Sequence, residues 1–124
     1  VHLGGEDAGL RAARSRLGDN AIIGISCYDS LELARKARTA GADYLAFGAF
    51  FDSPTKPAAV RAPLALLREA GDNLRLPVVA IGGVTLGNGA ELVKAGASLL
   101  AVISGVFGSN DPEKAARAYV ALFK

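Results

Sequence analysis

The sequence has no tryptophan and no methionine, a single cysteine, a single histidine, and only 6% aromatic residues. The lone Cys27 excludes an internal disulfide framework and is compatible with a reducing compartment. One cysteine and one histidine also fall short of the three or four nitrogen and sulfur ligands of a zinc site. With no second histidine, the sequence offers few residues from which to build a catalytic Cys–His pair or Ser–His–Asp triad. We therefore interpret His2 and Cys27 as mainly structural.

The sequence also lacks an excess of either charge, since 14 Lys and Arg against 12 Asp and Glu leave a net charge of only +2. No long run of basic residues occurs, which argues against a nucleic-acid partner. No apolar run approaches the roughly 18 residues of a membrane span, and no signal peptide precedes the first element. We therefore expect neither a membrane nor a nucleic-acid partner, and a cytoplasmic location by default.

Small apolar residues are abundant instead: 51% of the 124 residues are hydrophobic and 15 are glycine. Small residues suit close packing of helices on a sheet, so the composition indicates an Ala/Gly/Val-rich α/β protein. The length allows a single domain, residues 1–124, with a sizeable core.

Apolar stretches alternate with amphipathic ones along the chain and predict the element order βαβαβαβαβα. Such regular alternation implies parallel βαβ units with right-handed crossovers. The chain opens without Met on the last residues of a strand, so we expect it to be truncated. The expected strands are the one ending at residue 3 and those at 21–26, 43–48, 77–81 and 99–103, and the expected helices are 8–17, 31–40, 62–71, 88–95 and 112–123.

Five units fit either a small doubly wound sheet or a section of a (β/α)₈ TIM barrel. No Gly-x-Gly-x-x-Gly follows the first strand, where a dinucleotide fold needs it. Gly82-Gly83 and Ser104-Gly105 instead end the last two strands, where barrels commonly build a phosphate site; simple tight turns are the alternative. A complete barrel needs about 200 residues or more. We therefore predict an α/β protein of the TIM barrel family that supplies about strands four to eight.

The candidate binding residues follow the carboxyl ends of the expected strands, the face on which barrel enzymes place their sites. Glu6 and Asp7 follow the first strand, where they either ligate Mg²⁺ or cap the next helix. Ser26 ends the second strand and either donates to a phosphoryl oxygen or is a simple strand-end hydroxyl.

The loop over residues 49–62 is long for a compact domain, and such loops usually bind or cover something. Ser53-Pro54-Thr55-Lys56 sets two hydroxyls around a proline that fixes φ, with a cation beside them. That set suits an anionic ligand, and a solvated loop is the alternative. We expect Thr55, Gly83 and Ser104 to open onto one socket for a phosphate ester, with Lys56 facing a leaving diphosphate across it. Such a set suits chemistry driven by leaving-group departure.

Seven motifs occur together in this order: VHLGGED (1–7), IGIS (23–26), GADY (41–44), FG (47–48), SPTK (53–56), IGGVT (81–85) and VIS (102–104). In combination they resemble thiamine-phosphate synthase, the pyrophosphorylase that joins the two halves of thiamine. The likeness covers the whole chain and corresponds to the family's second half, from the end of its fourth strand to its last helix. It implies a transferase that condenses hydroxymethylpyrimidine pyrophosphate with thiazole phosphate. In the family, pyrophosphate leaves first, and the thiazole nitrogen attacks the resulting pyrimidine-methyl cation.

The resemblance also implies roles for individual residues. Asp7 would be one of two carboxylates that hold Mg²⁺, and Ser26 and Lys56 would hold the pyrophosphate as the catalytic pair. The residues that would surround the thiazole phosphate are Ser53, Pro54, Thr55, Gly83, Ile103 and Ser104. The chain departs from the family pattern at Gly5, at Cys27-Tyr28 and at Asp52-Ser53. It also lacks the family's first half, with its pyrimidine contacts and the second Mg²⁺ carboxylate, so the implied partners are small molecules and either a missing amino-terminal half or another copy.

Two alternatives remain. Thiazole tautomerase is an isomerase on the same barrel, but it uses a histidine where this chain has Cys27-Tyr28 and lacks the SPTK-type loop. A non-catalytic phosphate-binding half barrel becomes the leading hypothesis if 124 residues are the whole polypeptide. An open sheet would then leave two unpaired edges and an exposed core face, and we would expect the piece to dimerise, bind the missing strands or aggregate.

Overall fold

The computed structural model of the chain describes residues 1–4, 9–55, 58 and 61–124. Its five strands form one parallel sheet in which spatial order equals chain order. A doubly wound sheet reverses its strand order at a switch point, whereas this order runs one way, as in a (β/α)₈ barrel. The predicted parallel α/β architecture is confirmed. The strands are β1 (His2–Leu3), β2 (Gly24–Tyr28), β3 (Tyr44–Phe47), β4 (Val78–Ile81) and β5 (Leu99–Ala101).

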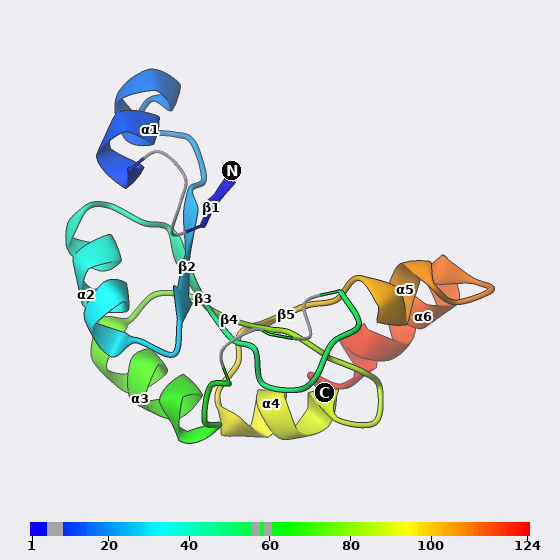
Figure 1. Cartoon of the computed structure of the whole chain (residues 1–124). Coiled ribbons are helices and arrows are strands. Elements are labelled where there is room, and N and C mark those ends of the chain that lie inside the picture. The colour runs from blue at the N-terminus through cyan, green and yellow to red at the C-terminus, as the bar shows by residue number, and fades with distance from the viewer. Residues whose placement is uncertain (5–8, 56–57, 59–60) are drawn as a thin grey trace.

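The helices lie on one side of a curved sheet. Figure 1 shows α1 to α4 following one another along its convex side, with α5 and α6 beyond the end of β5. In the described part of the chain no helix covers the concave side. The helices are α1 (Leu10–Leu17), α2 (Leu31–Thr39), α3 (Ala65–Leu74), α4 (Gly89–Ala95), α5 (Ser104–Phe107) and α6 (Pro112–Ala121).

The core lies between the sheet and the helices of the convex side. Ile23, Leu45 and Phe47 are fully buried there and belong to one apolar cluster with Leu67 of α3 and Leu92 of α4. Alternate strand residues point to opposite faces of a sheet, so their neighbours point to the concave side. The opposite, concave face bears several partly exposed apolar side chains, namely Ile22, Ile81 and Leu99.

That exposure corrects one prediction about the strands. A continuous apolar run such as 77–81 predicts a short strand that is buried on both faces. Val78, Val79 and Ala80 are buried, but Pro77 is exposed and Ile81 is 37% exposed. The reason is that no second layer of the described chain lies over the concave side at the carboxyl end of β4.

Local signals at the helix ends gave most boundaries correctly. Ser30 accepts a hydrogen bond from the Leu33 amide at 3.1 Å and begins α2, and Asp111 accepts one from the Lys114 amide at 3.0 Å and begins α6. The predicted helix at 62–71 was wrong in both bounds, because α3 runs from Ala65 to Leu74 and Gly71 lies inside it. Its end is set by Arg75, which adopts the left-handed conformation at φ 54°, two residues before Pro77.

Strand β2 also differs from the expected 21–26. It begins at Gly24, which pairs with both His2 of β1 and Tyr44 of β3, because the preceding amide, that of Ile23, donates to the Asp43 carboxylate instead of to a strand, and it extends to Tyr28. The register against β3 shifts between Ser26 and Tyr28, which leaves Cys27 as an extra residue in β2.

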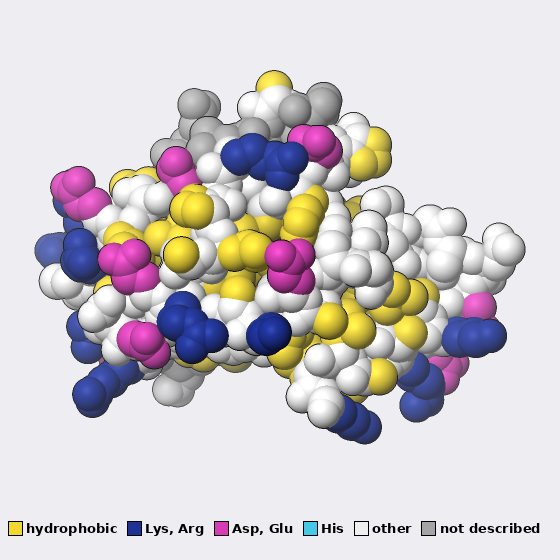
Figure 2. Space-filling model, turned by 90° about the horizontal axis from the view of Figure 1, so that it is seen from below, with side chains coloured by type: hydrophobic (Ala, Val, Ile, Leu, Met, Phe, Trp, Pro, Cys, Tyr) yellow, Lys and Arg dark blue, Asp and Glu magenta, His cyan; other side chains and the backbone are white. Residues whose placement is uncertain are grey.

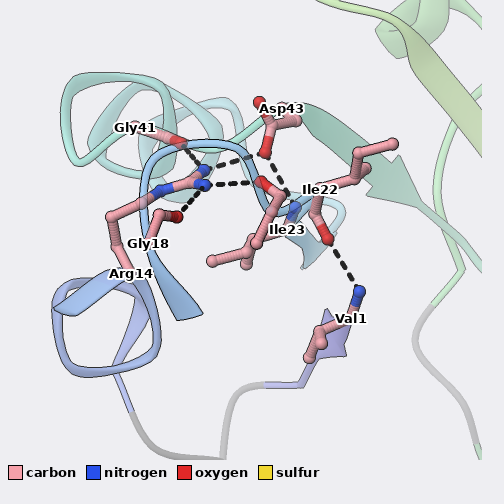
Figure 3. Close-up of polar contacts among 8 residues, drawn as sticks. Val1, Arg14, Gly18, Ile22, Ile23, Gly41 and Asp43 are labelled. Atoms are coloured by element: carbon pink, nitrogen blue, oxygen red, sulfur yellow. Dashed lines mark hydrogen bonds and ion pairs between the residues drawn. The ribbon is translucent and has the colours of Figure 1, made fainter. Parts of the chain in front are cut away.

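A polar cluster joins the amino-terminal ends of the strands, away from the predicted site. The Arg14 guanidinium donates to the carbonyls of Gly18, Ala21 and Gly41 and to the Asp43 carboxylate at 2.8 Å, as Figure 3 shows. The same Asp43 oxygen accepts the Ile23 amide at 2.8 Å. These contacts hold the end of α1 and the segments entering β2 and β3 together.

The outer surface carries both signs of charge. On the face drawn in Figure 2, Lys and Arg side chains are scattered among Asp and Glu and form no continuous basic surface. Within the described residues, no helix is both long and apolar enough to cross a bilayer.

Candidate functional site

A cavity of about 430 Å³ lies at the carboxyl ends of β2 to β5. Most of the residues predicted to bind phosphate line it, namely Ser26, Ser53, Thr55, Gly83, Ile103 and Ser104. Thr55, Gly83 and Ser104 therefore open onto one cavity, as expected, and its use as a socket for a phosphate ester stays a prediction. Pro54 is absent from the lining, and Asp7 and Lys56 lie outside the described residues, so the predicted position of Lys56 across the cavity stays a prediction.

Gly83 brings the long loop against the end of β4. Its φ is +65°, and a Cβ atom there would overlap the backbone of Phe51 and Asp52. The Phe50 amide donates to the Ile81 carbonyl at 3.3 Å, and the Phe51 amide donates to the Gly82 carbonyl at 3.2 Å. The sequence suggested that the glycines expose N–H groups to an anion. The structure adds that they let the loop bearing Ser53 and Thr55 approach the sheet.

One side chain that fixes this loop, that of Arg61, was not found from the sequence. Arg61 donates to the Phe50 carbonyl at 2.6 Å and to the Asp52 carboxylate at 2.9 Å. The Ser53 hydroxyl oxygen accepts the Thr55 amide at 3.2 Å, which makes a local turn and leaves the hydroxyl hydrogen of Ser53 to donate elsewhere.

Asn88 is the second residue that sequence reasoning missed. Its side-chain Nδ2 atom donates to the Gly83 carbonyl at 3.0 Å, and its side-chain Oδ1 atom accepts a hydrogen bond from the Thr85 backbone amide at 2.8 Å. In return the Thr85 hydroxyl oxygen accepts a hydrogen bond from the Asn88 backbone amide at 3.2 Å. The signal was available, since a hydroxyl residue three positions before Asn at the start of a helix is a typical reciprocal cap.

Ser26, at the β2 end of the cavity, contacts the only histidine of the chain. The Nε2 atom of His2 lies 2.7 Å from the Ser26 hydroxyl oxygen, and its Nδ1 atom lies 3.0 Å from the Tyr44 hydroxyl. The His2 and Tyr44 rings stack with their centroids 5.7 Å apart. No pattern in the sequence indicated that His2 touches a candidate binding residue.

Tyr28 and Cys27 differ in what they offer the site. Tyr28 lines the cavity, is 41% exposed and has an unusual φ of 53° after the register shift in β2. Cys27 is fully buried, and burial raises the pKa of its thiol to about 11. A thiol with that pKa stays protonated near neutral pH, which supports the structural interpretation of Cys27.

The described lining is rich in hydroxyl and backbone groups and contains no carboxylate. Within the described ranges there is also no group of three or more His, Cys, Asp or Glu side chains that could hold a metal. The four hydroxyls of Ser26, Ser53, Thr55 and Ser104 suit binding of phosphoryl oxygens.

Comparison with protein families gives one match: the model described as thiamine monophosphate synthase covers residues 1–106. Among curated proteins, the chain is 55% identical over 124 residues to the thiamine-phosphate synthase of Thioalkalivibrio sulfidiphilus, and 58% identical over 123 residues to that of Azoarcus sp.. It covers 59% and 60% of these two relatives, so the chain spans somewhat more than half the length of the curated proteins it matches.

Solved structures agree with the barrel-like architecture. A thiamine phosphate pyrophosphorylase from Pyrococcus furiosus superposes with a TM-score of 0.84 at 38% identity, over 99% of this chain and 58% of that one. A 3-hexulose-6-phosphate synthase superposes with a TM-score of 0.69 at 22% identity, which indicates a shared fold only.

Proposed function

Because the chain belongs to the thiamine monophosphate synthase family, we propose that it carries the carboxyl-terminal portion of a thiamine-phosphate synthase. Its strands would be about the fourth to eighth of a (β/α)₈ barrel. The unreversed order of the five parallel strands and the 58–60% of the relatives' length that it covers support this assignment. The cytoplasmic location expected from the sequence stays a prediction.

The proposed reaction condenses hydroxymethylpyrimidine pyrophosphate with thiazole phosphate. The bond from the pyrimidine methylene carbon to the pyrophosphate oxygen breaks, and both electrons leave with pyrophosphate. The lone pair of the thiazole nitrogen then forms the new carbon–nitrogen bond, giving thiamine phosphate. No strong general base is needed, because no proton is removed from either reacting centre. A cavity lined by hydroxyl donors suits this chemistry, since charge collects on the departing phosphoryl oxygens.

The observation that carries the proposal is that one cavity joins hydroxyls from both ends of the strand series. Ser26 lies within β2, near its carboxyl end, and Ser104 follows β5, three strand spacings apart, or roughly 14 Å along the sheet. That separation leaves room for two anionic groups with two aromatic rings between them. The volume of about 430 Å³ lies in the usual range for small-molecule sites.

We assign the pyrophosphate to the β2 end of the cavity. The hydroxyl of Ser26 would donate to a phosphoryl oxygen, and Lys56 would neutralise charge on the leaving group as the second member of this pair. A lysine ammonium suits the role because it is a compact point charge on a flexible stem.

We assign the thiazole phosphate to the β4 and β5 end. There Ser53, Thr55 and Ser104 would donate hydroxyl hydrogens, and the backbone at Gly83 would approach the phosphate closely because no side chain intervenes. Ile103 would form the apolar wall beside this phosphate. Pro54, which does not line the cavity, would act by holding the φ angle of the loop between the two hydroxyl residues.

Mg²⁺ is the implied cofactor, and Asp7 is the residue of this chain that would help to hold it. Magnesium prefers one or two carboxylates together with substrate phosphates. Asp7 would be one such carboxylate, since the described lining of the cavity has none. When bound, the ion would neutralise negative charge on the pyrophosphate as it departs.

The relatives named above are thiamine-phosphate synthases, which favours this function over the tautomerase and over a non-catalytic half barrel. The test is to incubate the protein as encoded by its gene with both substrates and Mg²⁺. We expect thiamine phosphate and pyrophosphate to form in equal amounts. Isomerisation of a thiazole substrate without pyrophosphate release would support the tautomerase instead, and neither product would support a binding protein.

A further inference from the structure

A cluster of three side chains crosses the first three strands on the concave side of the sheet. His2 of β1 pairs in register with Gly24 of β2, which pairs with Tyr44 of β3. A Cβ atom at position 24 would overlap the Tyr44 ring. The glycine therefore lets that ring lie across β2, where its hydroxyl comes within 3.0 Å of the His2 Nδ1 atom. The stacked rings hold the imidazole in a fixed orientation.

The other ring nitrogen of His2 lies 2.7 Å from the Ser26 hydroxyl oxygen, and Ser26 lines the cavity. For a neutral imidazole, two hydrogen-bond arrangements fit these distances. In the first, Tyr44 donates to Nδ1, so Nε2 carries the proton and donates to Ser26. In the second, Ser26 donates to Nε2, and Nδ1–H donates to the Tyr44 oxygen.

Only the first arrangement suits an anion. When Nε2–H donates to Ser26, one lone pair of the hydroxyl oxygen is used and its hydrogen is free to turn into the cavity. When Ser26 donates to Nε2, it presents only lone pairs to the cavity, and these repel phosphoryl oxygens. A phenol also donates a hydrogen bond more readily than an aliphatic hydroxyl, because its proton is the more acidic, which favours donation by Tyr44.

We propose that His2 is a positioning residue: the Tyr44 hydroxyl fixes its Nε2–H tautomer, and Nε2–H orients the Ser26 hydroxyl so that it donates to the pyrophosphate group of the substrate. This inference rests on the proposed function of Ser26. It adds a residue, His2, that does not touch the substrate and acts through the side chain of Ser26.

The tautomer is tested directly by nitrogen NMR on the ¹⁵N-labelled protein as encoded by its gene. The His2 signals are assigned by their loss in the His2→Gln variant. We expect a protonated Nε2 and an unprotonated Nδ1, and Tyr44→Phe should mix the two tautomers because it removes the donor that selects one. A protonated Nδ1 with an unprotonated Nε2 in the unsubstituted protein would overturn the proposal.

Function is tested by the affinity for inorganic pyrophosphate with Mg²⁺, measured by calorimetry. His2→Ala should weaken binding about three- to tenfold, because Ser26 keeps its hydroxyl but loses its orientation. His2→Gln is the matched control, since its amide nitrogen reaches the position of Nε2, and it should bind within about twofold of the original. His2→Asn reaches only toward Tyr44 and should behave as His2→Ala does.

A double-mutant cycle separates positioning from a general structural role. In a Ser26→Ala background, His2→Ala should produce no further loss, and neither substitution should change the affinity for thiazole phosphate. Losses that multiply, or equal affinity of the His2→Ala variant and the original protein, would overturn the proposal. Absence of pyrophosphate binding to the original protein would instead contradict the proposed function.

Discussion

The thiol of Cys27 illustrates how burial decides the chemistry of a single side chain. It is fully buried beside the cavity residues Ser26 and Tyr28, and desolvation raises its pKa from 9.0 to about 11. The thiolate is the nucleophile, and burial disfavours the charged form. Cys27 therefore contributes apolar volume to the bend in β2 rather than reactivity.

We predict that native Cys27 is alkylated about a hundredfold more slowly at pH 8 than a thiol of pKa 9.0, since the pKa difference is about two units. Iodoacetamide labelling followed by intact mass gives the rate, and the unfolded protein in urea is the control. Cys27→Ala should leave the condensation rate within about twofold of the original. Rapid labelling of the native protein at pH 8 would contradict this account of the thiol.

Asp43 shows the opposite shift, at the amino-terminal ends of the strands. The hydrogen bond from the Arg14 guanidinium and that from the Ile23 amide hold the pKa of this carboxyl below its usual value. A depressed pKa means that the folded state prefers the ionised form. The resulting stability is present above the unfolded pKa of about 3.9 and is lost as the pH falls through the folded value.

We predict that Asp43→Asn lowers the free energy of unfolding by about 1 kcal/mol at pH 7, a modest figure because the carboxylate is partly exposed. The difference should shrink at pH 3, which lies below the unfolded pKa of about 3.9, because the unfolded aspartate is then mostly protonated. Urea unfolding at both pH values measures it. A difference of equal size at pH 3 and pH 7 would show that the charge is not what matters.

At the scale of elements, the turn after β4 and the loop after β3 form one unit. Gly83 permits the loop backbone to approach, Asn88 holds the Gly83 carbonyl, and Arg61 ties the loop to itself. The side chains of Ser53 and Thr55 reach the cavity only because this unit is assembled.

We therefore predict that Gly83→Ala raises the KM for thiazole phosphate at least tenfold, because the methyl group overlaps the loop backbone and φ is +65°. Gly87→Ala in the same turn is the matched control. The added methyl group there would lie 3.7 Å from the Thr85 hydroxyl, an ordinary contact, so the kinetics should not change. Steady-state rates at varied thiazole phosphate distinguish the two, and an unchanged KM in Gly83→Ala would contradict a role for the glycine in loop placement.

How far the sequence predicts these elements depends on whether the signal is local. The starts of the helices at residues 31 and 112 were predicted correctly, because N-caps such as Ser30 and Asp111 are recognisable from residues within one turn. The end of α3 at Arg75 and the bounds of β2 were not predicted, because a left-handed non-glycine residue and the pairing of β2 with its neighbours leave no local signature.

The same distinction applies to the site. Strand-end hydroxyls were found because the carboxyl ends of parallel strands meet at one edge of a sheet. The contact between His2 and Ser26 joins residues 24 positions apart, and that between Arg61 and Phe50 joins residues 11 apart. Such contacts depend on how the strands are placed relative to one another, so residue spacing alone could not reveal them.

At the scale of the molecule, the two faces of the sheet are covered to different extents. Helices cover the convex side of the sheet, whereas the apolar side chains of Ile22, Ile81 and Leu99 are 68%, 37% and 47% exposed. The relatives are longer than this chain, which covers 59% of one and 60% of another. In a closed barrel the side chains of the remaining strands would cover these apolar side chains.

We predict that a polypeptide restricted to these 124 residues self-associates, because association would bury the concave apolar face and pair the open edges of β1 and β5. Sedimentation velocity should show species heavier than the 12.7 kDa monomer. Substituting Leu99→Lys should shift the distribution toward monomer. A monodisperse 12.7 kDa species that binds no apolar dye would contradict the prediction.

The central claim is that the two ends of one cavity hold two different phosphate groups. The most direct test is to compare both KM values of Ser26→Ala and Ser104→Ala in the protein as encoded by its gene. We predict a crossed pattern of roughly tenfold effects: Ser26→Ala raises the KM for the pyrimidine pyrophosphate alone, and Ser104→Ala raises that for thiazole phosphate alone. If each substitution changes both values equally, or changes the KM of the other substrate, the assignment of the two ends is wrong.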